Sequence, residues 1–274
     1  MTLPSPAHGL DAAYVALDER RFVASELTRG PWDPGYQHAG PPVALVCRAV
    51  ERAADAHGLG HVARLTANLV RPVPIGEVMV EVTPDYVGRN AAHFSARLLA
   101  AGKEVGRFTA LAQRESPVDL PAALPGHPLP AAPLAPDSSP EAHFPFRNEA
   151  APGYPDLVET RVARGRMWQG PCAVWFRLRH PLLSGELPGP YQRVAVAADS
   201  GNGISAILDY RRHTFVNADL TINLLRRPVG DWICLDARTV LGPAGCGLAE
   251  SALYDSRGLV GRATQSLAVR LRSS

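Results

Sequence analysis

Alternation of apolar and polar positions predicts a first series of short strands accompanied by one helix. The segment 41–53 is apolar on most sides and starts with two prolines, which suit the first turn of a buried helix. Two short strands at 14–17 and 21–27 precede it. Period-two alternation follows at 63–70, 78–86, 92–99 and 105–113.

A second series repeats this plan further along the chain. A helix is predicted from Asn202 to about Arg211. Strands are predicted at 158–163, 172–178, 215–225, 232–240, 248–254 and 260–270. A helix can be apolar all round only if a sheet wraps it, so each series predicts an α+β unit with an antiparallel sheet curled around one helix.

The chain also repeats itself in sequence. Residues 65–71 (LTANLVR) return as 220–226 (LTINLLR), and 105–109 (VGRFT) return as 260–264 (VGRAT). Both matches have the same offset of 155 residues, so the intervening length is conserved between the copies. Such a repeat predicts two similar units in tandem.

A proline-rich segment separates the two units. Eleven of the 26 prolines lie in residues 116–155, and such a segment can continue neither a helix nor a regular ladder. We therefore expect an N-terminal unit at 1–115, an extended connector at 116–155 that crosses the surface, and a C-terminal unit at 156–274.

Composition narrows the classes of function. With 46% hydrophobic residues, 20% charged residues and a net charge of +2, the chain predicts a soluble globular protein with no footprint for nucleic acid or membrane insertion. The four cysteines show no zinc-site spacing, and residues 1–14 lack the pattern of a secretory signal, so we expect a reduced, cytoplasmic protein without a bound metal. A homo-oligomer is compatible with this composition.

The polar candidates belong to the second copy. Asp199 precedes a Gly-rich segment at the start of the predicted helix, where a carboxylate can act as general base on water or simply cap the helix. Gln265 shares a strand face with apolar residues, so partners must hold its amide, either in a site or as a core bridge between strands. Its counterpart in the first copy is Ala110.

Other residues near the helix starts are weaker candidates. His38 stands before the first helix and can act as acid, base or oxyanion donor, or only bond a loop. Free N–H groups at the second helix start could stabilise an oxyanion, with Gly201 and Gly203 allowing close approach. Asn217 and Thr221 share a polar strand face, and Asn217 would need a β-bulge to reach a site on the apolar side.

The ordered motifs resemble those of the acyl-CoA thioesterase II-like family, which has the double hotdog fold. The similar segments are 37–42 (QHAGPP, which includes His38 and Gly40), 198–203 (ADSGNG), 219–222 (DLTI), 226–228 (RRP) and 263–265 (ATQ). The resemblance implies hydrolysis of an acyl-CoA by water held by an Asp, a hydroxyl residue and a Gln. Asp199 and Gln265 match two positions; Asn217 falls on the third, where Thr221 is the nearest hydroxyl.

The resemblance also implies the substrate, and it leaves alternatives. Acyl-CoA is the expected partner, with no cofactor beyond the CoA of the substrate; Arg89 and the arginines at 71, 226 and 227 are candidates for its phosphates. An acyl tunnel lined by small aliphatic residues is expected. The alternatives are a non-catalytic acyl-CoA binding protein, or a hydratase or dehydratase that uses His38 as base.

Overall fold

The computed structural model describes residues 11–121, 130–148 and 150–272. The first series of elements agrees with the predicted strands and helix to within a few residues. It comprises β1 (Tyr14–Ala16), β2 (Arg21–Ala24), η1 (Glu26–Thr28), α1 (Gly40–Asp55), β3 (His61–Leu69), β4 (Glu77–Val87), β5 (Ala91–Ala100) and β6 (Lys103–Gln113).

The second series follows a short stretch of irregular elements. The stretch holds η2 (Pro136–Ser138), β7 (Glu141–Ala142) and α2 (Tyr154–Leu157). The series itself comprises β8 (Val158–Arg164), β9 (Cys172–Leu178), α3 (Pro190–Ala198), α4 (Gly201–Ser205), β10 (His213–Asn217), β11 (Asp219–Leu224), β12 (Ile233–Leu241), β13 (Cys246–Asp255) and β14 (Gly258–Leu271). Long antiparallel strands with few helices make the fold α+β, as predicted.

The strands of the described residues form one 14-stranded sheet. Its order is β1-β2-β4-β5-β6-β3-β11-β14-β13-β12-β9-β8-β7, and β10 pairs with β14 beside this path. The order β2-β4-β5-β6-β3 returns in reverse as β11-β14-β13-β12-β9, so the two series meet at β3 and β11. There Thr66 pairs with Thr221, its own repeat counterpart 155 residues later. The seam therefore has local twofold symmetry.

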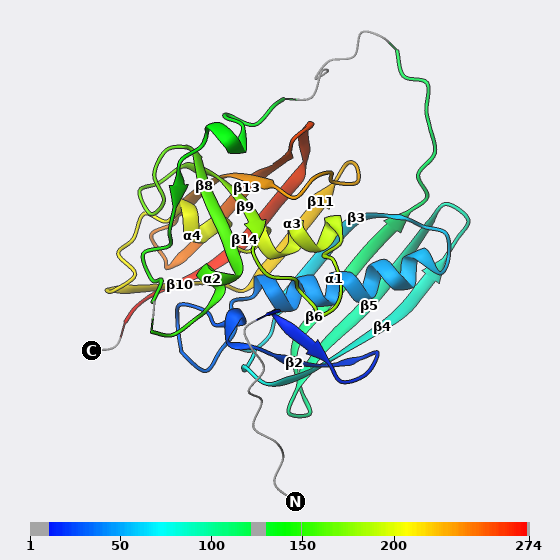
Figure 1. The fold of residues 1–274 in the computed structure, drawn as a ribbon, viewed down its shortest axis with the longest axis horizontal. Coiled ribbons are helices and arrows are strands. Elements are labelled where there is room, and N and C mark those ends of the chain that lie inside the picture. The colour runs from blue at the N-terminus through cyan, green and yellow to red at the C-terminus, as the bar shows by residue number, and fades with distance from the viewer. Residues whose placement is uncertain (1–10, 122–129, 149, 273–274) are drawn as a thin grey trace, which may run out of the picture.

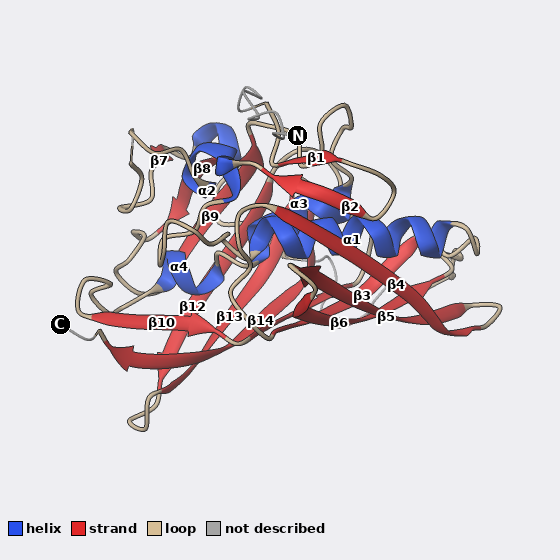
Figure 2. Ribbon diagram, turned by 90° about the horizontal axis from the view of Figure 1, so that it is seen from below, coloured by secondary structure: helices blue, strands red, loops and turns tan. Residues whose placement is uncertain are grey.

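The two longest helices lie side by side on the concave face of the sheet (Figures 1 and 2). They run antiparallel. A Cβ on Gly40, at the start of α1, would lie 2.5 Å from the Val196 carbonyl near the end of α3. At the other end Gln192 donates to Glu51 at 3.0 Å. Only a glycine permits this close approach, which brings the start of α1 against the end of α3.

The helix predicted at 202–211 is wrong in position. The main helix of the second series is α3, which begins at Pro190 after an extended Gly189, and only 201–205 continue as the short α4. Ala206 is extended and ends it. Proline at the first helical position explains the early start. Asp199 is consequently the C-terminal cap of α3, and its side chain does not cap α4.

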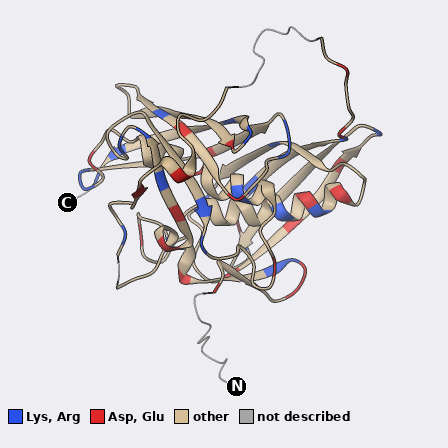
Figure 3. Cartoon of the chain, turned by 45° about the horizontal axis from the view of Figure 1, so that its top comes forward, with Lys and Arg blue, Asp and Glu red and all other residues tan. Residues whose placement is uncertain are grey.

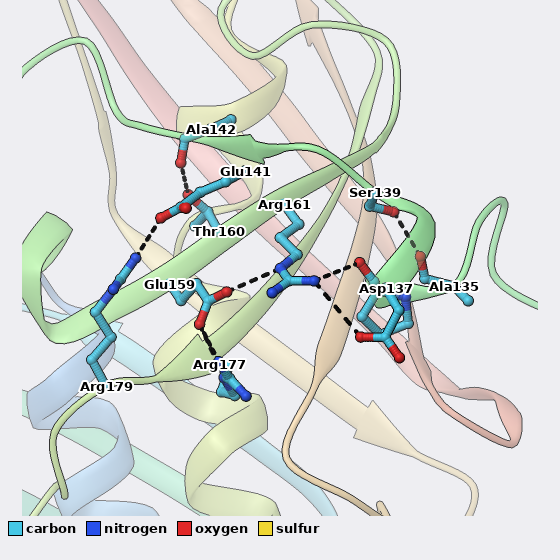
Figure 4. Close-up of polar contacts among 11 residues, drawn as sticks. Ala135, Asp137, Ser139, Glu141, Ala142, Glu159, Thr160, Arg161, Arg177 and Arg179 are labelled. Carbon is cyan, nitrogen blue, oxygen red and sulfur yellow. Dashed lines mark hydrogen bonds and ion pairs between the residues drawn. The ribbon is translucent and has the colours of Figure 1, made fainter.

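The connector docks on the second series over much of its described length. Residues 116–121 are exposed coil, as predicted. Further on, β7 pairs with β8, and the Trp175 Nε1–H donates to the Leu134 carbonyl at 2.7 Å. Figure 4 shows Glu159 of β8 between Arg161 and Arg177, while Arg179 reaches Glu141 of β7. The described residues 130–148 and 150–155 therefore pack as part of the fold and are not extended throughout.

Residues of both charge signs are spread along the strands and helices (Figure 3). Among the described residues, no helix combines the length and the apolarity that a membrane crossing needs.

Candidate active site

A cavity of about 380 Å³ lies where the start of α1, the end of α3 and β10 meet. Its wall is mainly apolar and rich in aromatic rings, and it also includes His38, Asp199 and Asn217. Large side chains from the connector, loops and β10 line this space, so it is not the tunnel of small aliphatic residues expected between sheet and helix, which stays a prediction. The rings of the wall belong to Trp32, Tyr36, Phe144, Phe146, Trp168 and Phe215.

His38 and Asp199 form a pair at one side of this cavity. His38 Nδ1 lies 3.0 Å from Asp199 Oδ2, and their side chains are 11% and 4% exposed. The antiparallel packing of α1 and α3 causes this, because His38 comes two residues before α1 and Asp199 directly after α3. The two residues, one from each series of elements, therefore share one cavity.

The electrostatics of Asp199 favour its ionised form. Burial raises the pKa of this carboxyl group, but the His38 ring and hydrogen bonds from His38, Asn217 and the Gly40 N–H outweigh burial, so the pKa lies below its usual 3.8. His38 Nδ1 lies within reach of two partners, the Asp199 carboxylate at 3.0 Å and the Gly40 N–H at 3.1 Å. An unprotonated Nδ1 accepts the Gly40 N–H, whereas a protonated Nδ1 donates to the carboxylate. In the second tautomer Nε2 is an acceptor with no hydrogen-bond partner among the described residues.

Tyr154 supports the histidine from behind. Its ring stacks on His38 with centroids 3.7 Å apart and an interplanar angle of 2°. The hydroxyl group donates to the Val196 carbonyl at 3.0 Å and bonds Ser200 Oγ at 2.8 Å. Tyr154 thus ties the imidazole to the end of α3. No sequence pattern singled out this residue, because it lies in the proline-rich connector, between Gly153 and Pro155.

Gln265 lies behind Asp199 and does not form part of the cavity wall. It is 2% exposed, so the prediction of a buried amide held by partners is confirmed. Its Nε2 donates to the Asp199 carbonyl at 3.0 Å and lies 3.4 Å from Asp199 Oδ1, while Oε1 accepts the Asn202 N–H at 2.9 Å. That N–H is therefore occupied, although free N–H groups were expected at this helix start.

Asn217 joins the pair, whereas Thr221 does not. Asn217 Nδ2 donates to Asp199 Oδ1 at 2.7 Å. Asn217 pairs with Leu267 and Thr221 with Thr264, so three residues, 218–220, face two, 265–266. This extra residue is the bulge that the sequence analysis required, and it turns Asn217 to the opposite face from Thr221. The Thr221 hydroxyl instead contacts Thr66 Oγ1 at 3.3 Å on the seam.

The three candidate glycines have different surroundings. A Cβ on Gly201 would lie 2.6 Å from Ser251 Oγ and 3.2 Å from Gln265 Oε1, so this glycine admits protein neighbours and not a substrate. Gly40 permits the contact of α1 with α3. Gly203 lines the cavity, and a Cβ there would meet nothing within 4 Å.

The arginine candidates for phosphate binding lie apart from this pair or are already engaged. Arg89 sits in the turn after β4, beside the His61 end of the sheet, whereas the cavity is reached at the Leu69 end of β3. The Arg226 guanidinium donates through both Nη atoms to the Asp255 carboxylate, at 2.6 and 2.7 Å. Arg71 lines the cavity, but its Nη1 donates to the Glu104 carbonyl.

Comparisons with known proteins agree with this arrangement of elements. Residues 28–113 match the family model of the acyl-CoA thioesterase N-terminal domain, and residues 130–269 match that of the C-terminal domain. No curated protein matches the chain significantly.

Solved structures of the same fold cover nearly the whole chain. A candidate thioesterase II from Thermobifida fusca is 18% identical with a TM-score of 0.71, covering 94% of this chain and 96% of its own. A hot dog fold protein from Alicyclobacillus acidocaldarius is 19% identical with a TM-score of 0.66, covering 96% and 97%. An acyl-CoA thioesterase II from Mycobacterium marinum is 15% identical with a TM-score of 0.62, covering 95% and 96%.

At these identities the solved structures show the fold alone, which is the hotdog fold. The family models together span both series of elements and include the segments that hold His38 and Asp199. The chain belongs to the acyl-CoA thioesterase family and is a thioester hydrolase.

Proposed function

We propose that this chain hydrolyses acyl-CoA thioesters to a free acid and CoA in the cavity beside His38 and Asp199, with water activated by these two residues as a unit. The observation that carries the proposal is the 3.0 Å contact between His38 Nδ1 and Asp199 Oδ2 at the cavity wall. The fold is interpreted here as two hotdog units in tandem, at 1–115 and 156–274, joined by the connector at 116–155.

The pair is a better base than Asp199 alone. A carboxylate whose pKa is lowered by several donors binds a proton weakly. An imidazole that donates Nδ1–H to that carboxylate keeps Nε2 available, and the adjacent negative charge stabilises the imidazolium once it forms. This extends the interpretation from the sequence, in which Asp199 was to accept the proton by itself.

The reaction then needs no group beyond these side chains, water and the substrate. The water oxygen attacks the thioester carbonyl carbon, and its proton passes to His38 Nε2. The C–S bond of the tetrahedral intermediate breaks, and the CoA sulfur leaves with that proton as a thiol. Asn217 and Gln265 act on Asp199: Asn217 donates to Oδ1 from the cavity side, and Gln265 from the buried side. We propose that no metal or redox cofactor takes part.

The test compares Asp199→Asn, His38→Gln and the double variant in a thiol-release assay across an acyl-CoA panel. We expect each single variant to lower kcat by about 10²- to 10⁴-fold, the usual contribution of a general base. Because the two residues act as a unit, the double variant should be no slower than the slower single variant. Thermal unfolding of each variant controls for loss of structure.

Contrary results would separate the alternatives. Unchanged kcat in His38→Gln, with loss in Asp199→Asn, would leave Asp199 as the sole base. Wild-type protein that binds acyl-CoA without releasing thiol would indicate a binding protein. A change in enoyl absorbance without thiol release would indicate a hydratase, for which an Asp–His pair is also a suitable base.

A further inference from the structure

A group of three exposed arginines lies at the end of β10 that is distant from Asp199. Arg211, Arg212 and Arg272 are all exposed, and none of them forms an ion pair with a carboxylate among the described residues. The acid nearest in sequence, Asp209, uses Oδ1 to accept the Arg211 backbone N–H at 2.9 Å. Within the part of the chain that the structure describes, the three guanidinium groups therefore have no carboxylate partner.

Two hydrogen bonds and a ring contact hold Arg272 against the cavity wall. The Arg272 N–H donates to the Arg212 carbonyl at 2.9 Å, and its Nε donates to the Tyr210 carbonyl at 2.8 Å. The Arg272 guanidinium lies over Trp32, 5.6 Å from the ring centroid. Trp32 is a wall residue that contacts Phe215 of β10 edge-on at 5.1 Å. Arg272 is thus placed at the rim of the cavity by its own side-chain contacts, and the backbone of Arg212 lies beside it.

The length of strand β10 gives the distance from this rim to the His38–Asp199 pair. Asn217, at one end of the strand, bonds Asp199, and Arg212 directly precedes the other end. Arg212 and Asn217 are five residue steps apart along extended chain, which is roughly 17 Å. Phe215 and Val216, between the two ends, line the cavity.

This span matches one part of the CoA molecule. The pantetheine arm, from the sulfur to the first phosphorus, is about as long as an extended peptide of four to five residues, roughly 15 Å. A thioester placed beside Asp199 would therefore put the phosphates of the nucleotide at the arginine rim if the arm followed β10. Guanidinium groups bind phosphate through paired N–H donors, which suits them to that position.

We propose that Arg211, Arg212 and Arg272 bind the phosphates of the CoA nucleotide, with the pantetheine arm lying along β10. The proposal rests on the proposed function, because it takes the His38–Asp199 pair as the site of the thioester. It replaces the expectation that Arg89 fills this role. It also makes the enzyme selective for a nucleotide-bearing thioester through contacts distant from the reacting atoms.

The experiment compares an acyl-CoA with the matching acyl-pantetheine, which keeps the arm and lacks the nucleotide and its phosphates. In the Arg212→Ala/Arg272→Ala variant we expect KM for acyl-CoA to rise about tenfold or more, the usual effect of losing a charge-assisted hydrogen bond. KM for acyl-pantetheine and kcat for both substrates should stay near the wild-type values. Arg89→Ala is the matched control and should leave every constant unchanged.

A second measurement keeps this proposal separate from the proposed function. Calorimetric binding of adenosine 3′,5′-bisphosphate to wild-type protein should weaken with added salt and be lost in the double variant. If wild type hydrolyses no thioester but binds the bisphosphate through these arginines, only the hydrolytic proposal fails. Equal rises in KM for both substrates, an unchanged KM for acyl-CoA, or an equal effect of Arg89→Ala would overturn the assignment of the rim.

Discussion

At the scale of single residues, the site depends on side chains that hold one another in place. Asp199 is bonded by His38, Asn217 and Gln265, and His38 is covered by the Tyr154 ring. None of these contacts is between neighbours in sequence. Each residue is therefore positioned by tertiary packing, and a change behind the pair should reach the chemistry through the orientation of the imidazole.

Tyr154 gives a matched pair of substitutions for this idea. Tyr154→Phe keeps the stacked ring and loses only the hydroxyl bonds to Val196 and Ser200. We therefore expect kcat to stay near the wild-type value and the free energy of unfolding to fall by about 1 kcal/mol. Tyr154→Leu removes the stack, and kcat should fall about two- to tenfold. Steady-state kinetics and urea unfolding of both variants provide the check, and equal kcat values in the two variants would count against positioning by the ring.

At the scale of elements, α1 and α3 place one half-buried carboxyl group at the far end of their contact. Glu51 of α1 lies beside Gln192, at the beginning of α3. Burial raises the pKa of Glu51 to about 7, although the Gln192 bond and the charge of Arg227 act against it. Relative to the unfolded chain, the folded protein therefore favours the protonated form of Glu51, because ionisation leaves a poorly hydrated charge that the Gln192 bond only partly offsets.

This shift predicts a pH-dependent stability. Because the pKa of Glu51 is higher in the folded protein than its ordinary 4.5, stability should decrease as the pH rises from about 4.5 to about 7. Glu51→Gln removes that loss and should be more stable than wild type at pH 8, by about 1–3 kcal/mol. At pH 4.5 the two proteins should differ little. Urea unfolding at both pH values is the measurement, and a constant difference across this range would refute the assignment.

At the scale of the whole molecule, the two series are joined by more than the connector. The β3–β11 ladder and the packing of α1 against α3 both cross between them, and β1 bridges to Leu183. The exposed segment 116–121 contributes no strand or helix. The association of the two parts should therefore survive a break in this segment.

A protease site introduced within 116–121 tests that expectation. After cleavage, the two pieces should elute together from a sizing column and keep the kcat of the intact chain, because His38 and Asp199 come from different pieces and meet only across this contact. An uncleaved sample of the same variant is the control. Separation of the pieces with loss of activity would mean that the connector, and not the packing, holds the site together.

Sequence patterns predicted most strands well because alternation reports which side of a strand is buried. They failed at α3. The Gly-rich segment after Asp199 was interpreted as the start of the helix, whereas the helix begins at Pro190, directly after Gly189. They also left Asn217 and Thr221 as alternatives, because in a regular strand without a bulge both side chains point to the same face. A bulge at 218–220 separates those faces, and its position depends on pairing with β14.

The sequence by itself determined the buried helix α1 and the presence of Gln265 among apolar neighbours, because local periodicity reports which residues are buried. It also determined the repeated plan, because two pairs of similar segments share one offset of 155 residues. Only the tertiary structure decided that His38 from the first series and Asp199 from the second form one site with Tyr154 behind them. The physical reason is that this meeting follows from the antiparallel contact of two helices through Gly40, an interaction between residues more than 150 positions apart that no local pattern contains.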